Sequence, residues 1–496
     1  MYDHIWCLLT LCDFLPIIHK FQTPTLTISR APPAMESIPT LRLLANIITE
    51  SVNTMERVYT KAGMPLPSLD ESFHRQDPAE ALRQNSEISA AVKNLMAAAA
   101  QLTATVCDPV VMVVNSAFAF HISACLRAAS ELNVVEILRE AGPRGVHAKE
   151  IAAPSRTSPD LMARILRLLA THHIFREVSP GVFANNRISS TLDKGKPSSI
   201  LFENREERLT GTLGVSALVE SAADNTFKAS AFLTETLLHP EEQKLPYNRA
   251  NRTDEPMFKV LQRPENRYNL KRFAVAMQGT AAADPPERIL QGFDWGMLPS
   301  GGVLVDVGGG IGHASMAIAL KYSTLQIINQ DLGPAIELSK SHWKEHFPTH
   351  LNIRFQIHDF FTPQPVRNAD VFLMRYIIHD WTNTQAVSIL KHLREAAMAT
   401  TKLVLIEKIV PVASGDELGQ EIPGATRPRA AYPLLSNWGI ATAELYMYDM
   451  TMHNMLGGVE RTLEGFIDVL AESGWKLAQV HHCPPSQLSH LVAVPC

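Results

Sequence analysis

Apolar positions in the first part of the chain recur every three or four residues, which is the period of an amphipathic helix. This spacing predicts helices over 41–58 and 86–106, joined by a linker at 65–77 that is rich in Pro, Ser and Asp. The next segment, 109–129, is apolar at almost every position. A helix of that kind has no face for water, so we expect it to be buried or to face another subunit.

Residues 145–190 contain a short helical pattern, a turn, a longer helix that starts at Ser158 and Pro159, and a β-hairpin. This order predicts a winged-helix unit. Helices that read DNA present polar side chains to base edges. Here the second helix is dominated by leucine and isoleucine, and only Arg164 and Arg167 are placed to reach phosphates. We therefore expect packing and dimerisation from this unit rather than DNA binding.

From about residue 300 onward, short runs of Val, Ile and Leu alternate with helical segments, which predicts an α/β fold with a parallel sheet covered on both faces. The segment 412–440 is rich in Pro, Gly and Asn and predicts a long surface loop. A helix at 463–473 and two strands follow it. The predicted strands of the parallel part lie at 303–305, 325–328, 353–357, 371–374 and 403–406.

The size and charge of the chain narrow the function classes. At 496 residues the chain exceeds what one hydrophobic core usually supports, so we expect at least two domains. A net charge of −5 provides no global basic field for a nucleic acid. The 6 cysteines are scattered and form no CxxC pair, which argues against a disulfide framework or a zinc site and fits a reducing cytoplasm.

An apolar run at 5–18 resembles a leader only superficially. It is interrupted by Asp13 and Pro16, it lacks a basic start, and it is too short to cross a bilayer. We expect residues 1–34 to form a loosely ordered extension, with neither a secretory signal nor a membrane anchor.

The segment 303–312 (VLVDVGGGIG) is a strand that runs into a glycine turn and then a helix. Glycines let the backbone approach a ligand, and the start of a helix offers unpaired N–H groups. A dinucleotide fingerprint would need Gly where the chain has His313. The pattern D-x-G-x-G-x-G, which begins at Asp306, suits S-adenosylmethionine instead. Asp331, about 20 residues past the loop, is placed to hold both ribose hydroxyls.

His379 follows an apolar strand, at the end of a parallel sheet where ligands bind. One interpretation is that it only fills a turn, while Asp380 or Thr382 caps the next helix. The other is that it is a base. Glu407 ends the next strand, and Glu460 precedes a helix, where it could also belong to a capping box. If both carboxylates reach His379, they hold its tautomer and leave the other nitrogen free to accept a proton.

Six motifs in this order, VDVGGGIGH, NQDL, HDFF, LMRYIIHDW, LIEKIVP and GGVERT, resemble the plant-type (caffeic acid-like) class I O-methyltransferases. The chain is most similar to fungal members that act on aromatic polyketides of the sterigmatocystin type. The resemblance covers roughly residues 85–496 and implies a Rossmann-like domain with a mostly parallel, seven-stranded sheet, preceded by an α-helical winged-helix dimerisation domain. It divides the chain into the extension 1–34, a dimerisation domain 35–195, a helical connector 196–285 that lines the substrate site, and a cofactor domain 286–496.

The resemblance also implies residue roles. It makes His379 the proton acceptor, flanked by Glu407 and Glu460. It places Met450 and Asn454 against the acceptor substrate, although a methionine fits an ordinary core equally well. The cofactor residues that it implies are Gly308, Gly310 and Gly312 beside S-adenosyl-L-methionine, Asp331 at the ribose, Asp359 and Phe360 at the adenine, and Arg375 near the amino-acid end.

Together these observations predict an S-adenosylmethionine-dependent O-methyltransferase that uses a histidine base on the phenolic hydroxyl of a small aromatic metabolite. Because no carboxylate cluster suited to magnesium is visible, we expect no metal. We expect a homodimer in the cytoplasm, with no nucleic-acid or membrane partner. The alternative is a winged-helix regulator that binds the cofactor and senses a ligand without catalysis. An oxidoreductase is disfavoured by His313.

Overall fold

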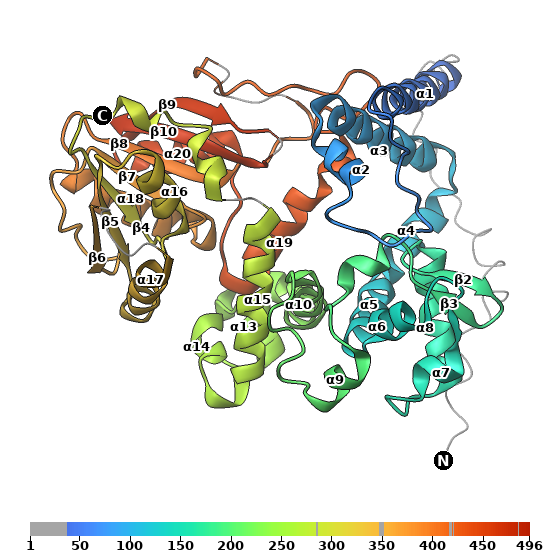
Figure 1. Ribbon diagram of the computed structural model, residues 1–496. Coiled ribbons are helices and arrows are strands. Elements are labelled where there is room, and N and C mark those ends of the chain that lie inside the picture. Colours follow the sequence, from blue (N-terminus) through green and yellow to red (C-terminus); the bar gives the residue numbers. More distant parts are fainter. Residues whose placement is uncertain (1–36, 284–285, 347–351, 416–418, 420, 485) are drawn as a thin grey trace. The chain divides into compact units, whose positions relative to one another are not determined.

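A mixed sheet with strand order β6-β5-β4-β7-β8-β10-β9 forms the core of the second half of the chain (Figure 1). The strands from β6 to β8 run parallel, and β10 pairs antiparallel with both β8 and β9. The strand order therefore reverses direction between β4 and β7, the point at which α/β sheets open a ligand crevice. The strands are β4 (Val303–Val307), β5 (Gln326–Asp331), β6 (Ile353–Ile357), β7 (Val371–Arg375), β8 (Lys402–Lys408), β9 (Trp475–His482) and β10 (Leu488–Pro495).

Helices cover both faces of this sheet, which is why its central strands read as unbroken apolar runs. On one face Phe372 packs with Phe466 and Trp475, and on the other Leu304 packs with Ile318. The covering helices are α16 (His313–Lys321), α17 (Gly333–His346), α18 (Asn383–Ala396) and α20 (Leu463–Glu472). The predicted α/β sheet is thus confirmed, and each predicted strand coincides with an observed one to within a few residues.

The computed structural model describes residues 37–283, 286–346, 352–415, 419, 421–484 and 486–496. The predicted extension 1–34 lies outside the described residues. From Leu44 to Cys496 the chain forms one unit of contacting elements, and the domain boundaries given above stay predictions. The first helices are α1 (Ser37–Lys61), α2 (Pro78–Ala81) and α3 (Ser86–Val106). Asn85 caps α3 by accepting hydrogen bonds from the N–H groups of Glu87 and Ile88.

The apolar segment 109–129 folds as two helices, α4 (Pro109–Phe118) and α5 (Phe120–Glu131). Of the two alternatives for this segment, burial within the chain is excluded for α4, because Val110 and Val113 are 69% and 70% exposed, and the subunit-facing alternative stays a prediction. Within the described residues, Pro109–Glu131 is the one helical stretch that is long and apolar enough to cross a membrane, judged by length and composition alone. An exposed face of this kind is also what a subunit interface leaves uncovered in a single chain.

The predicted winged helix is present, with a small antiparallel sheet of order β1-β3-β2. Ser158 caps the second helix, as its sequence indicates. That helix buries Met162, Leu166 and Leu169, and the guanidinium of Arg167 is held by the carboxylate of Glu177 at 2.9 Å. The unit therefore packs through its apolar helix. Its elements are α6 (Val134–Ala141), β1 (Val146–His147), α7 (Ala148–Ala152), α8 (Pro159–Thr171), β2 (Arg176–Ser179) and β3 (Val182–Ala184).

A group of helices connects this unit to the sheet and packs against α19 (Ala443–Leu456), which leads to the site. Helices α10 and α15 approach so closely that a Cβ on Gly214 would lie 2.6 Å from the Cα of Gly279. The connecting helices are α9 (Ser198–Glu203), α10 (Val215–Ser221), the π-helix η4 (Ala222–Thr226), α11 (Phe227–Ser230), α12 (Leu233–Leu238), α13 (Pro246–Asn251), α14 (Met257–Leu261) and α15 (Arg267–Ala283).

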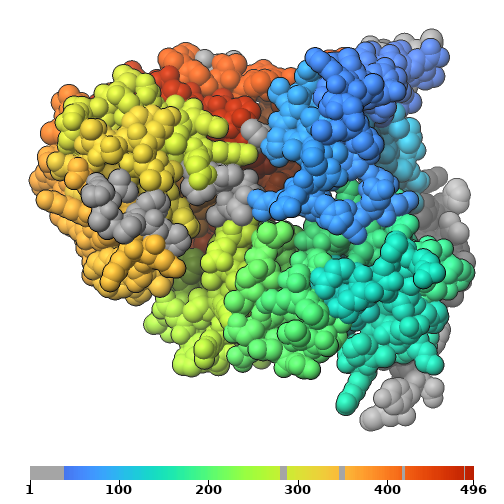
Figure 2. Space-filling model, viewed as in Figure 1, coloured from blue at the N-terminus to red at the C-terminus, as the bar shows by residue number. Residues whose placement is uncertain are grey.

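The described residues of the predicted loop 412–440 contain no strand and no helix before η10 (Gly439–Thr442). The loop is anchored on α3, because Gln101 donates a hydrogen bond to the carbonyl of Pro433 at 2.7 Å and the Trp438 indole donates to Asn94 at 2.8 Å. Figures 1 and 2 show the orange loop beside the blue helix α3. Short 3-10 helices complete the chain: η2 (Leu82–Gln84), η3 (Ser189–Leu192), η5 (Pro240–Glu242), η6 (Pro264–Asn266), η7 (Pro286–Leu290), η8 (Trp295–Met297) and η9 (Ile378–Asp380).

Candidate active site

His379 lies in η9, directly after β7, at the carboxyl edge of the sheet. Its Nδ1 is 2.9 Å from Oε1 of Glu460 and 3.9 Å from Oε2 of Glu407. The two glutamate side chains are 2% and 0% exposed, while 14% of the histidine side chain is accessible. The structure thus brings the three predicted catalytic residues together, although 81 positions separate His379 from Glu460 in sequence.

Backbone groups hold the carboxylate of Glu407 and the main chain of Glu460. Oε1 of Glu407 accepts hydrogen bonds from the N–H groups of Ile377 and Ile378, at 2.9 and 3.0 Å. The N–H of Glu460 donates to Oδ1 of Asp449 at 2.9 Å. The capping-box interpretation of Glu460 is wrong, because Thr462 is the N-cap of α20.

The helix that follows His379 has its own cap. Thr382 and Gln385 form a capping box at the start of α18. Thr382 is thus the cap that the first interpretation allows, and the side chain of His379 takes no part in it but contacts Glu460.

The pKa values of the cluster reflect burial and mutual charge. Burial lowers the pKa of His379, but the Glu407 charge and the Glu460 hydrogen bond outweigh it and raise the pKa to about 9. Burial raises the pKa of Glu407 to about 7, against the opposing charge of His379. Oδ1 of Asp380 lies 3.5 Å from Nε2 of His379, and burial raises the pKa of Asp380 as well. The imidazole is thus a strengthened base with acidic groups at both nitrogens.

The glycine loop lies between β4 and α16, and Gly308, Gly310 and Gly312 have φ values of 73°, 57° and 87°. These left-handed conformations favour glycine. A Cβ on Gly308 would lie 2.6 Å from Cδ1 of Ile377, whereas no atom of the described residues lies within 4 Å of a Cβ on Gly310. The loop therefore leaves open space above Gly310, and this cradle fits a ligand that approaches the backbone.

Of the other predicted cofactor residues, Asp331 and Phe360 lie against the same loop. Both carboxylate oxygens of Asp331 accept backbone hydrogen bonds, from Gly310 at 2.8 Å and from Leu332 at 2.7 Å. Phe360 lies beside the loop, because its ring is 3.6 Å from where a Cβ of Gly308 would stand. Asp359 accepts a hydrogen bond from the N–H of Phe361 at 3.0 Å. Arg375, at the end of β7, lies over the Tyr376 ring, 5.2 Å from its centroid.

The two predicted acceptor residues lie on α19. Met450 is 41% exposed, so it is not an ordinary core methionine. Asn454 is 2% exposed, and its Nδ2 donates to Oγ of Ser230 at 3.0 Å. Its buried Oδ1 has no hydrogen-bond partner among the described residues. An oxygen of this kind is suited to accept a hydrogen bond from a ligand hydroxyl.

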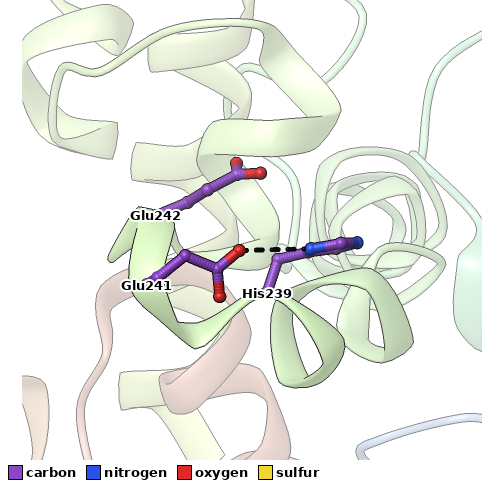
Figure 3. Close-up of side chains that lie close together, drawn as sticks. All are labelled: His239, Glu241 and Glu242. Atoms are coloured by element: carbon purple, nitrogen blue, oxygen red, sulfur yellow. Dashed lines mark hydrogen bonds and ion pairs between the residues drawn. The ribbon is translucent and has the colours of Figure 1, made fainter.

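A second group of histidine and carboxylates follows α12, and Figure 3 shows its three side chains. His239 lies 3.3 Å from Glu241, and Glu242 pairs with Arg249 at 3.0 Å. All three members of the group are exposed. Solvated clusters of this type are common on surfaces, and their exposure alone does not make them a site.

Comparison with known proteins identifies the family. A model of the O-methyltransferase domain matches residues 231–423, and a model of the O-methyltransferase dimerisation domain matches residues 114–195. An O-methyltransferase of Armillaria gallica is 40% identical over 470 residues, which cover 92% of this chain and 99% of that protein. The chain is an O-methyltransferase of this family.

Other relatives of this O-methyltransferase include the 4-O-methyltransferase 1 of Phanerochaete chrysosporium, 36% identical over 89% of the chain and 95% of that protein. The sterigmatocystin 8-O-methyltransferase of Aspergillus parasiticus is 31% identical over 61% of the chain and 66% of that protein. Because proteins of this family transfer a methyl group, the alternative of a regulator without catalysis is set aside. The chain is an enzyme of the fungal secondary-metabolite type.

Solved structures share the fold. The mitomycin 7-O-methyltransferase MmcR aligns with a TM-score of 0.58 and 21% identity, over 78% of this chain and 97% of that one. The SAH-bound form of CalO1, a methyltransferase in calicheamicin biosynthesis, aligns with a TM-score of 0.55 and 20% identity, over 79% of this chain and all of that one. The cofactor of the O-methyltransferase is S-adenosyl-L-methionine, in agreement with the open glycine cradle and the acid that follows it.

The roles of three polar residues in the site are not predicted from the sequence. Asp449 and Arg461 support the cluster through backbone groups, and Asp380 approaches the second nitrogen of His379. The motif GGVERT contains both Glu460 and Arg461. Of the two, only the carboxylate of Glu460 suggests a role in catalysis from the sequence alone. The partners of an arginine that bonds to main-chain carbonyls cannot be identified from sequence spacing.

Proposed function

We propose that His379 is the general base of the methyl transfer and that the acceptor is the phenolic hydroxyl of a small aromatic metabolite. The observation that carries the proposal is the contact between Nδ1 and Glu460 at 2.9 Å. An ionised carboxylate only accepts hydrogen bonds, so Nδ1 keeps its hydrogen and the lone pair of the neutral ring resides on Nε2. That nitrogen is then the one that takes the proton of the acceptor.

Each residue of the site has a distinct role in this proposal. Nε2 of His379 accepts the hydroxyl proton as the new carbon–oxygen bond forms, and Glu460 and Glu407 stabilise the resulting imidazolium. Asn454 offers its buried Oδ1 to a second polar group of the acceptor. When bound, S-adenosyl-L-methionine supplies the methyl group on a cationic sulfur, and Gly308, Gly310 and Asp331 would hold it. Alignment of acceptor and donor contributes most of the remaining rate.

Direct proton transfer is favoured over metal assistance, although ligand atoms of His379, Glu407 and Glu460 lie within 4.8 Å of one another. Oε1 of Glu407 is already engaged by two N–H groups. Glu460 is engaged by His379 itself, in the carboxylate–imidazole arrangement that raises basicity.

The substrate class, assembly and location rest on weaker support and belong to the same proposal. Two relatives are named for O-methylation at 4-O and 8-O positions, and we expect an aromatic polyketide here. The dimerisation domain and the exposed face of α4 support a homodimer. We keep the expectation of no nucleic-acid or membrane partner as part of the proposal. Cytoplasmic location fits the unbridged cysteines Cys107, Cys125, Cys483 and Cys496.

The test compares His379→Gln with His481→Gln, a substitution on β9 outside the cluster. With a panel of hydroxylated polyketides as acceptors, His379→Gln is expected to lower turnover by about 10²–10⁴-fold while calorimetry shows unchanged cofactor affinity. The control is expected to keep its turnover. Full turnover in His379→Gln contradicts the base assignment.

Removal of metal provides a second test. Dialysis of the enzyme against a chelator is expected to leave turnover unchanged, because the base needs only its two carboxylates. Loss of turnover on chelation, with recovery when magnesium or zinc is added back, would show that a cation occupies the cluster instead.

A further inference from the structure

The segment that supplies Glu460 also holds the loop that carries His379. The N–H of Val459 donates to the carbonyl of His379 at 2.8 Å. Gly458 lies so close to the loop that an added Cβ would stand 2.2 Å from the same carbonyl oxygen. Residues 458–461 therefore form a brace along η9, and the position of the catalytic imidazole depends on this contact.

Arg461 is the residue of this brace with the most contacts to the loop. Its Nη1 donates to the carbonyl of Ile378 at 2.6 Å, and its Nη2 donates to the carbonyl of Trp381 at 2.9 Å. Its Nε donates to Oδ1 of Asn383 at 3.0 Å. The guanidinium thus contacts residues on both sides of His379, through a planar fork that a lysine cannot reproduce.

The same cation lies among the acids of the site. Burial lowers the pKa of Arg461, while the charges of Glu407, Glu460 and Asp449 oppose that effect. Arg461 is 2% exposed. A buried cation needs compensating negative charge, and here the charges that act on it are those of Glu407, Glu460 and Asp449.

We propose that Arg461 is a positioning residue for methyl transfer: it holds the η9 loop so that Nε2 of His379 meets the acceptor hydroxyl. The inference rests on the proposed role of His379 and adds a determinant of its geometry. Arg461 does not touch the reacting atoms. It acts through the main-chain carbonyls of Ile378 and Trp381, so its removal displaces the imidazole without removing it.

The chain offers a matched control. Arg394 on α18 also bonds to main-chain carbonyls, because its Nε donates to Gly474 at 2.9 Å and its Nη2 donates to Cys496 at 2.9 Å. These contacts lie away from η9. Arg394→Met therefore shows how much kcat falls when an arginine that only supports the fold is lost. Arg461→Met shows the same loss together with any effect on the position of His379.

The experiment measures kcat, KM for the acceptor, cofactor affinity by calorimetry and the thermal midpoint of each full-length variant. Arg461→Met is expected to lower kcat by about 10²-fold, the effect of a misplacement near 1 Å, with unchanged cofactor affinity. Arg394→Met is expected to lower the thermal midpoint without that loss. Arg461→Lys keeps the charge but loses the fork, so it is expected to remain folded with kcat between those of wild type and Arg461→Met.

Chemical rescue separates positioning from folding. In Arg461→Ala, added guanidinium at millimolar concentration is expected to restore part of kcat, whereas it restores nothing in Arg394→Ala or in His379→Gln. Equal kcat in Arg461→Met and Arg394→Met would overturn the inference while the loss in His379→Gln leaves the proposed base intact. If His379→Gln also keeps its turnover, the proposed function itself fails.

Discussion

At the scale of single residues, the imidazole of His379 and a phenol bind their protons with similar strength. The pKa of His379 is raised to about 9, and that of a free phenol is about 10. A proton therefore passes between them with little uphill cost once the two groups are aligned. The acids around Nδ1 set this match, because burial alone would lower the pKa of the ring.

The raised pKa predicts the pH dependence of activity. His379 acts only without its second proton, so below pH 9 the active fraction falls about tenfold for each pH unit. We expect kcat/KM to rise with pH and to level off near pH 9, the pKa of His379 in the structure. A profile of kcat/KM against pH tests this expectation, and a flat profile above pH 7 would contradict it.

Neutralising Glu460 is expected to move the rising limb of the profile of kcat/KM against pH. Glu460→Gln removes the negative charge at Nδ1, which lowers the pKa of His379, so the limb shifts toward lower pH. The weaker base and the less firmly held ring are expected to reduce the plateau by about 10–100-fold. Glu464→Gln, which alters an acid in the first turn of α20, serves as the control and is expected to leave both limb and plateau in place.

At the scale of elements, the site depends on contacts between main-chain segments that are distant in sequence. The carboxyl end of β7 brings η9 beside β8, and residues 458–461 close over it from the other side. Gly458 is required here for space and not for its backbone conformation, because an added Cβ would lie 2.2 Å from the carbonyl oxygen of His379 while its φ is not in the left-handed range.

Gly458→Ala is expected to displace η9, because the new Cβ would lie 2.2 Å from the carbonyl oxygen of His379. We expect kcat to fall by about 10²-fold with cofactor affinity preserved. Gly465→Ala, whose nearest contact is 3.4 Å, should leave kcat unchanged. Equal kcat in the two variants, measured with the same acceptor, would show that η9 tolerates the intrusion.

The elements also show where sequence reasoning succeeds and where it stops. The strands of the sheet are predictable because burial on both faces demands continuous Val, Ile and Leu. Glu407 is predictable because it ends such a strand. For α4 the apolar composition leaves burial and a subunit-facing position open, because both cover apolar side chains, and the exposure of Val110 and Val113 in the single chain excludes only burial. Asp449 and Arg461 are missed because their partners are backbone groups, which every sequence contains.

At the scale of the whole molecule, the exposed apolar side chains of α4 bear on the proposed homodimer. Val110 and Val113 lie just before the matched dimerisation domain, which begins at residue 114. Burying such side chains against a second copy would remove apolar area from water at roughly 25 cal/mol per Å².

Val113→Glu is accordingly expected to weaken self-association. The control is Leu238→Glu on α12, because Val113 and Leu238 are both 70% exposed. Sedimentation of both variants over a range of concentrations checks the expectation. If Val113→Glu sediments as wild type does, the homodimer uses another surface.

The reversal of strand order between β4 and β7 has a practical consequence for anyone who wishes to shorten this enzyme. The residues of its active site lie on turns spread from Gly308 to Glu460, so a short fragment of the chain cannot contain all of them. A fragment limited to 231–423, where the catalytic domain model matches, would lack Glu460 and would also strip β10 from β8. The bare edge of β8 would then be open to pairing with other molecules, and such a truncation should precipitate rather than catalyse.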